Sequence, residues 1–157
     1  MLDVISNEAF PSSNRTSLAV GEETLEASGR LCGAQRNLNP VAEKTERVSD
    51  GHAVMPGVTM VSTPGHTPGH MSVMVEDGGR QLLVTGDALT HPNVSFERPD
   101  WHFGFDQDPE LAARTRATLL DRLARDKVGI IGYHLPWPGV GRVEAGQAGR
   151  FRYIAES

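Results

Sequence analysis

The segment STPGHTPGHMSVMV, Ser62–Val75, places two histidines four residues apart in a turn that cannot be helical. Pro64 and Pro68 fix φ and lack an amide donor, so this part of the chain does not continue as a helix. The spacing of His66 and His70 is therefore not the i, i+4 ligand pair of a helical zinc site. Apolar, strand-like runs precede and follow the turn. We expect a rigid loop between two strands, with partners for its histidines elsewhere in the chain.

Composition limits the class of protein. The 157 residues predict a single domain with a sizeable core. Lys and Arg number 15 against 20 Asp and Glu, giving a net charge of −5, and no basic run occurs. Nucleic acid and anionic membranes are therefore not expected partners. No stretch is apolar enough to span a bilayer, no basic leader is visible, and Cys32 has no second cysteine for a disulfide, so we expect a cytoplasmic protein.

Two regions differ in pattern. Residues 1–50 are polar and weakly patterned, with one candidate helix at 20–28. Residues 51–157 alternate between apolar runs and turn residues, and Gly78-Gly79 is typical of a hairpin turn. Strands are expected at 57–63, 70–77, 80–87, 127–133, 142–146 and 149–156, and a helix at 109–125. Strands mixed with a helix on one side predict an α/β, layered sandwich with a mixed sheet.

The predicted helix has a clear start and an amphipathic pattern. Asp108 is a favourable N-cap, and Pro109 suits the first helical position. An apolar stripe at helical spacing is expected to face the core, formed by Leu111, Thr115, Leu119, Leu120 and Leu123. The arginines on the other faces, Arg114, Arg116, Arg122 and Arg125, are interpreted as a solvated surface.

Three candidate metal ligands each follow a predicted strand. His66 follows MVSTPG, Asp87 ends LLVTGD, and His134 follows IIGY. Functional groups gather at strand ends because a rigid scaffold holds the loops there. Imidazole and carboxylate together suit zinc, iron or manganese, and the two oxygens of Asp87 could bridge two ions. Each motif alone is common, whereas two histidines framed by Pro-Gly serve no obvious packing purpose.

Taken in order, TPGHTPGH, LLVTGD and GYHLPWPGVGRV resemble the C-terminal portion of the metallo-β-lactamase superfamily. Residues 45–157 resemble most its methyl parathion hydrolase-like and lactonase-like members. The resemblance implies part of an αββα sandwich with one or two zinc ions. It also implies hydrolysis of a small ester, lactone or organophosphate-like substrate by an activated water.

The resemblance also implies roles for individual residues. His66 and His134 would be ligands to different ions, Asp87 would bridge the two ions as the catalytic centre, and His70 would brace the loop from behind the ligands. Apolar walls of a substrate pocket would come from Phe96, Trp101, Phe103 and Trp137. The alternative for the first three is a loop tied down by its own aromatic residues. His91 and His102 lie in the same loop, and Tyr133 is expected in the core.

One departure from the family pattern is large. The superfamily's His-x-His-x-Asp-His motif, which supplies ligands to both ions, does not occur, and only His52 precedes His66. We therefore expect a truncated chain with impaired activity and an uncovered sheet face, which would favour a homo-oligomer or another partner. The alternatives are a non-catalytic fragment, a subunit whose partner supplies the missing histidines, and a binding module without metal.

Overall fold

The computed structural model describes residues 36–37 and 39–156. The chain divides into two compact units, Pro11–Arg47 and a larger unit of Met1–Phe10 with Val48–Ser157. In the smaller unit the described part contains a 3-10 helix, η2 (Asn39–Lys44). The predicted helix at 20–28 and Cys32 lie outside the described residues. No helix in the described ranges is long and apolar enough to cross a membrane.

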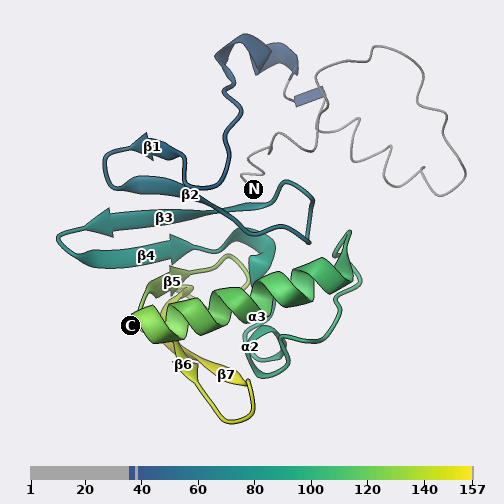
Figure 1. Cartoon of the computed structure of the whole chain (residues 1–157), viewed down its shortest axis with the longest axis vertical. Coiled ribbons are helices and arrows are strands. Elements are labelled where there is room, and N and C mark those ends of the chain that lie inside the picture. Colours follow the sequence, from purple (N-terminus) through teal and green to yellow (C-terminus); the bar gives the residue numbers. More distant parts are fainter. Residues whose placement is uncertain (1–35, 38, 157) are drawn as a thin grey trace, which may run out of the picture. The chain divides into compact units, whose positions relative to one another are not determined.

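The larger unit is built on one mixed sheet whose seven strands lie side by side in chain order (Figure 1). Neighbouring strands are antiparallel except β4 and β5, which are parallel. The mixed sheet predicted from the sequence is therefore confirmed, while the short first strand was not predicted. The strands are β1 (Ala53–Met55), β2 (Val58–Ser62), β3 (Met71–Asp77), β4 (Arg80–Val84), β5 (Gly129–Ile131), β6 (Val140–Ala145) and β7 (Phe151–Ala155).

The turn between β3 and β4 has the expected chemistry. Gly78 and Gly79 both have positive φ, 55° and 76°, and Asp77 pairs with Arg80 across the turn. A two-residue hairpin with positive φ at both central positions follows the right-handed twist of the strands, and glycine adopts it without strain. The Gly-Gly pair therefore fixes the register of the two strands that lead to the candidate site.

Helix α3 (Pro109–Asp126) is the crossover between the parallel strands β4 and β5. It begins as predicted, because the Asp108 side chain accepts a hydrogen bond from the Leu111 amide at 2.9 Å. Its C-cap, Lys127, is left-handed with φ 54°. The buried stripe of the helix consists of Ala112, Ala113, Arg116, Leu119, Leu120 and Leu123. The interpretation of Arg116 as solvated was therefore wrong, since its 1% exposure places it inside this stripe.

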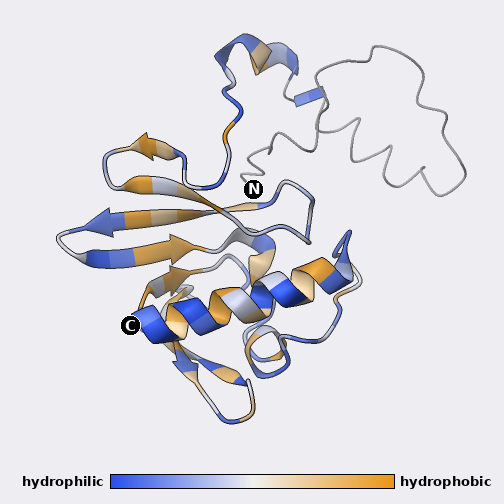
Figure 2. Cartoon of the chain, viewed as in Figure 1, coloured by the Kyte–Doolittle hydropathy of each residue, from blue (hydrophilic) through white to orange (hydrophobic). Residues whose placement is uncertain are grey.

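The core lies between the sheet and the helices in front of it (Figures 1 and 2). Met74, Leu83 and Ile130 are cross-strand neighbours on β3, β4 and β5, so their side chains share one face. They pack in one cluster with α3 residues, with Phe96 from α2 (Val94–Glu97), and with Leu89, which follows η3 (Gly86–Ala88). The orange and blue stripes along α3 in Figure 2 show the same amphipathic division.

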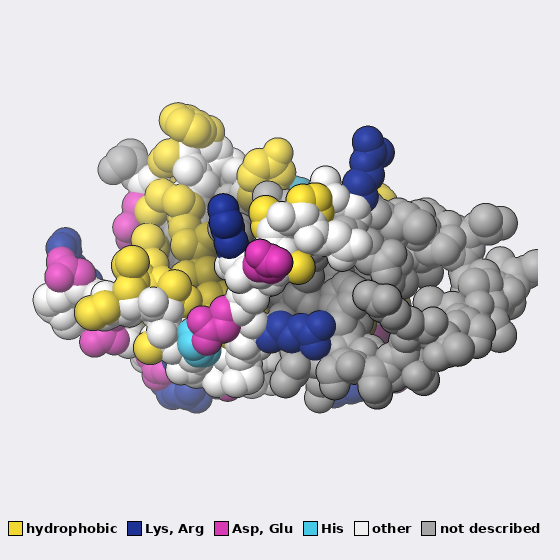
Figure 3. All heavy atoms as spheres, turned by 90° about the horizontal axis from the view of Figure 1, so that it is seen from above, with side chains coloured by type: hydrophobic (Ala, Val, Ile, Leu, Met, Phe, Trp, Pro, Cys, Tyr) yellow, Lys and Arg dark blue, Asp and Glu magenta, His cyan; other side chains and the backbone are white. Residues whose placement is uncertain are grey.

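The opposite face of the sheet is also apolar. Residues of β2–β6 that alternate with the core positions point to it, namely Val58, Met60, Val73, Val75, Leu82, Val84, Ile131 and Val140. From the helices, the core on the first face includes Ala88 of η3, Phe96 of α2, and Leu119, Leu120 and Leu123 of α3. Val84 is 40% exposed on the second. In the view from above, hydrophobic side chains gather into a continuous area (Figure 3).

Candidate metal centre

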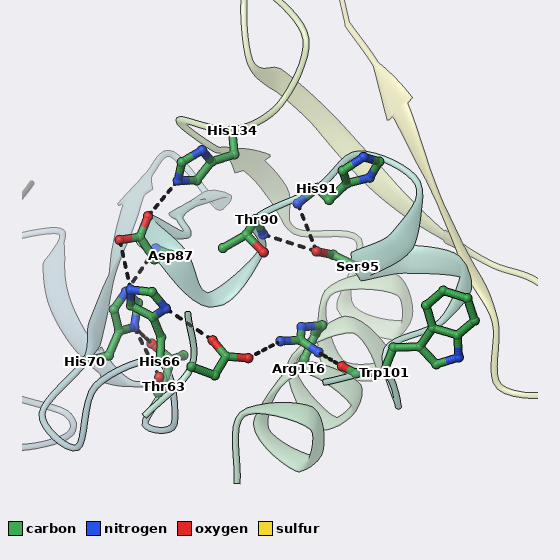
Figure 4. Close-up of polar contacts among 11 residues, drawn as sticks. Thr63, His66, His70, Asp87, Thr90, His91, Ser95, Trp101, Arg116 and His134 are labelled. Atoms are coloured by element: carbon green, nitrogen blue, oxygen red, sulfur yellow. Dashed lines mark hydrogen bonds and ion pairs between the residues drawn. The ribbon is translucent and has the colours of Figure 1, made fainter. Parts of the chain in front are cut away.

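Three loops bring His66, Asp87 and His134 to one edge of the sheet (Figure 4). His66 lies in the loop after β2, Asp87 in η3 after β4, and His134 in the loop after β5. Strands β2, β4 and β5 run in the same direction, because β3 is antiparallel to both β2 and β4 while β5 is parallel to β4. The carboxyl ends of these three strands therefore meet at one edge, where ligands bind in α/β sheets.

The Asp87 carboxylate lies between the two histidines. Its Oδ1 is 3.0 Å from Nε2 of His134, and its Oδ2 is 3.5 Å from Nε2 of His66. Each carboxylate oxygen thus faces a different imidazole. The Asp87 side chain is 7% exposed, that of His66 17% and that of His134 37%, so the site is most open on the His134 side.

The donor types fit zinc, whereas the donor number is low. Imidazole nitrogen and carboxylate oxygen are ordinary zinc ligands. Within the described ranges, however, no three His, Cys, Asp or Glu side chains converge to hold one ion. The geometry instead gives two half-sites that share Asp87, each with one imidazole and one carboxylate oxygen. Either half-site would need further donors to complete a tetrahedral shell.

His70 is buried behind this edge, with 2% exposure, and both its ring nitrogens contact the protein. Nε2 accepts a hydrogen bond from the Asp87 amide at 3.0 Å, so the ring carries its proton on Nδ1. Nδ1 lies 3.1 Å from the Thr63 carbonyl oxygen and 2.8 Å from the Thr63 hydroxyl. That hydroxyl is 3.0 Å from Ser72 Oγ, which donates to the Thr85 carbonyl oxygen. The His70 ring thus joins the loop after β2 to the backbone of Asp87.

The backbone geometry explains why a glycine precedes both His66 and Asp87. Gly65 has φ 128°, and a Cβ there would lie 2.3 Å from the Cα of Ala112 in α3. Gly86 has φ 55°, and a Cβ there would lie 2.8 Å from Nε2 of His70. Both positions therefore need a residue that tolerates positive φ and has no side chain. Gly65 lets the loop that carries His66 pack closely against α3, and Gly86 lets the backbone at Asp87 approach the His70 ring.

Behind His66 lies a buried ion pair that the sequence analysis missed. His66 Nδ1 is 3.1 Å from Asp106 Oδ1, and Asp106 Oδ2 accepts from Arg116 Nη2 at 3.0 Å. The two charged side chains are only 1% and 2% exposed. Burial lowers the pKa of the Arg116 guanidinium, and Asp106 counteracts that shift. One signal was available, because Arg116 lies four residues after Ala112 and four before Leu120, on the buried stripe.

The four predicted pocket residues have different environments. Phe96 is fully buried in the core, 5.6 Å from the Tyr153 ring, so its assignment to a pocket wall was wrong. Phe103 is half-buried, with the Arg116 guanidinium 4.4 Å above its ring. Trp101 is 49% exposed and Trp137 94% exposed.

The expectation for Tyr133 was wrong, and the two histidines of the aromatic loop have different surroundings. Tyr133 is 89% exposed rather than in the core, and its ring lies 5.1 Å from that of His134. His91 caps α2, because its Nδ1 accepts hydrogen bonds from the amides of Asn93 and Val94 at 3.2 and 3.1 Å. His102 is exposed. The loop is thus held by its own backbone and caps as well as by aromatic packing.

Comparison with known proteins identifies the family. The sequence model of the metallo-beta-lactamase superfamily matches residues 20–134, which is more than half of the chain. The chain belongs to the metallo-β-lactamase superfamily. Within that superfamily it is 35% identical over 82 residues to the N-acyl homoserine lactonase AiiA of Bacillus thuringiensis subsp. kurstaki. It is 38% identical over 69 residues to a probable metallo-hydrolase of Mycobacterium tuberculosis.

Solved structures of the superfamily share this fold. The hydrolase AbOPH matches 98% of this chain with a TM-score of 0.82 at 24% identity. The dizinc quorum-quenching lactonase AidC matches 87% of it with a TM-score of 0.78 at 27% identity. The matched parts are 54% and 46% of those chains, and 31% of the AiiA lactonase. The match to the Mycobacterium tuberculosis protein covers 22% of it, so the chain spans between about a fifth and about a half of these relatives.

Proposed function

We propose that this chain carries part of a two-zinc site that hydrolyses a small ester, lactone or phosphotriester. The observation that carries the proposal is the division of the Asp87 carboxylate between two histidines, with Oδ1 facing His134 and Oδ2 facing His66. An ion pair with one histidine would not require a second imidazole beside the other carboxylate oxygen. Membership of a superfamily with a dizinc lactonase among its solved members supports the choice of zinc.

The roles of the residues follow from these contacts. His66 and Asp87 Oδ2 would hold one ion, and His134 and Asp87 Oδ1 the other. When bound, zinc would activate a water for attack and polarise the bond to be cleaved. His70 would keep the Asp87 backbone in place through its hydrogen bond to the Asp87 amide. The greater exposure of His134 than of His66 supports substrate entry from the His134 side.

Exposed aromatic side chains beside His134 would receive the apolar part of a substrate. Tyr133 and Trp137 are 89% and 94% exposed, and both lie in the loop that carries His134. Acyl and aryl groups bind to such surfaces because the apolar area leaves water. Relatives named as N-acyl homoserine lactonases, and AidC in complex with a homoserine product, support a lactone with an acyl chain as the first substrate to test.

We expect the isolated chain to bind zinc weakly and to turn over substrate slowly, because each half-site has only two of the donors that zinc takes. Metal content after reconstitution and dialysis, and rates against lactones, aryl esters and phosphotriesters at saturating zinc, measure both properties. Asp87→Ala should abolish the zinc-dependent signal, since both half-sites lose their carboxylate. Asp100→Ala is the matched control, because Asp100 is exposed and pairs with Arg98. Zinc binding or turnover that survives Asp87→Ala would refute the proposal.

A second candidate function is a partner-dependent or non-catalytic piece. It is favoured by the absence, within the described ranges, of three ligands that converge on one ion. It predicts zinc binding that depends on Asp87, with no turnover of any substrate in the panel even at saturating zinc. Tight, stoichiometric zinc with robust turnover would instead mean that further donors exist in this chain, and His52 would be the first to replace.

A further inference from the structure

We propose that Asp106 and Arg116 form one positioning unit that sets the tautomer of His66 and anchors the loop at 98–106. The part that concerns zinc rests on the proposed function, whereas the part that concerns the imidazole and the loop does not. Asp106 and Arg116 would act on the reaction through His66 and the loop, without touching the reacting atoms.

The contact with Asp106 determines which nitrogen of His66 is free. Asp106 Oδ1 is 3.1 Å from Nδ1 of His66, and its other oxygen already accepts from Arg116. A carboxylate can only accept, so it favours the proton on Nδ1 and leaves the lone pair on Nε2. Nε2 is the nitrogen that faces Asp87, at 3.5 Å. Asp106 thus holds His66 in the tautomer and direction that a zinc ligand needs.

Arg116 holds the carboxylate and the loop with one rigid group. Its Nη2 donates to Asp106, while its Nη1 donates to the carbonyl oxygens of Pro99 at 3.0 Å and Trp101 at 2.9 Å. The guanidinium also lies 4.4 Å from the centre of the Phe103 ring. In Figure 4 the Arg116 guanidinium lies between Trp101 and His66. A planar fork can make these contacts at once, whereas a lysine ammonium is a single point charge.

The end of the same loop is tied to the histidine loop by backbone hydrogen bonds. The Gln107 amide donates to the His66 carbonyl oxygen at 3.1 Å, and the Asp108 amide donates to the Gly65 carbonyl oxygen at 3.0 Å. The backbone around His66, the carboxylate behind its ring and the loop that carries Trp101 are therefore parts of one connected structure. A change at Arg116 should reach both the imidazole and the tryptophan.

Asp106→Asn tests the tautomer directly. Arg116 Nη2 needs an acceptor, so the amide oxygen of Asn should turn to Arg116 and its NH₂ group should face His66 Nδ1. The His66 proton should then move from Nδ1 to Nε2. Ring ¹⁵N NMR of the metal-free protein distinguishes the two tautomers and measures this. Asp100→Asn, at an exposed carboxylate, is the matched control and should leave His66 on its Nδ1–H tautomer.

Zinc affinity and the loop give two further readouts. Asp106→Asn should lower zinc affinity about 10- to 100-fold, as the loss of an orienting carboxylate does elsewhere. Arg116→Lys keeps the charge beside Asp106 but loses the fork, so the Trp101 indole signal should shift while His66 keeps its Nδ1 proton. Arg114→Lys, at an exposed arginine of the same helix, is the matched control. It should change neither the Trp101 indole signal nor the tautomer of His66.

The outcomes separate this inference from the proposed function. An unchanged His66 tautomer in Asp106→Asn would overturn the positioning role of Asp106. An unchanged Trp101 signal in Arg116→Lys would overturn the anchoring role of Arg116. If the tautomer moves as expected while neither protein binds zinc, the positioning unit stands and the proposed function fails.

Discussion

Gly65→Ala is expected to destabilise the larger unit by roughly 3 kcal/mol or more, from backbone strain and overpacking together. The new Cβ would lie 2.3 Å from the Ala112 Cα, and helix backbone cannot yield as a flexible side chain can. The φ of 128° is also a conformation that L residues rarely adopt. Relief of the clash would push the histidine loop away from α3 and take His66 out of line with Asp87. Urea denaturation followed by circular dichroism measures the loss of stability.

Gly79→Ala is the matched control for this prediction. Gly79 also has positive φ, 76°, but a Cβ there would meet no atom within 4 Å. Only the backbone strain remains, which costs about 1–2 kcal/mol. Equal loss of stability in the two variants would show that the close approach of Gly65 to α3 contributes nothing.

The positions of most strands along the chain, and of the candidate ligands after them, could be read from local patterns. Gly-Gly at the hairpin, Asp108-Pro109 at the helix start and apolar runs before each functional residue all depend on near neighbours in the chain. Three strands that run in one direction must end at one edge, so the juxtaposition of His66, Asp87 and His134 followed from topology.

The periodicity of α3 could have placed Arg116 on the buried stripe, but the partner of its side chain could not be read in this way. Whether an arginine on a helix faces water or a buried carboxylate depends on what packs against it. Here Arg116 meets Asp106 from a loop ten residues away, and a periodicity argument that treats charged residues as exposed excludes that pairing. Phe96 was misplaced for a similar reason. A short helix turns its ring into the core, and no apolar stripe in the sequence marks so short an element.

The same distinction applies to the two faces of the sheet. Alternation along β3 and β4 placed Met74 and Leu83 on one face, but Val73 and Val84 make the other face apolar as well. A strand that is apolar on both sides is typical of a sheet that is covered twice. The described helices cover one of these faces, and the sequence analysis expected the other to be uncovered in this chain.

Arg116→Met is expected to cost about 3–5 kcal/mol of unfolding free energy, because it leaves the Asp106 carboxylate buried without its partner. The Asp106 side chain is 1% exposed, so water cannot replace the guanidinium without opening the loop. The Pro99 and Trp101 carbonyl oxygens would lose their donor in the same step. Thermal and urea denaturation of the metal-free protein measure the effect without reference to zinc.

A double-mutant cycle separates the ion pair from the packing of the arginine side chain. Asp106→Asn combined with Arg116→Met removes both charges, and the double variant should be more stable than the sum of the single losses predicts, since no unpaired charge stays buried. Arg114→Met is the matched control, because that arginine is 67% exposed and lies 4.0 Å from Glu110. It should change stability by no more than about 0.5 kcal/mol. If Arg116→Met lost as little unfolding free energy as Arg114→Met, the buried ion pair would not hold the loop. The backbone hydrogen bonds alone would then connect α3 to His66.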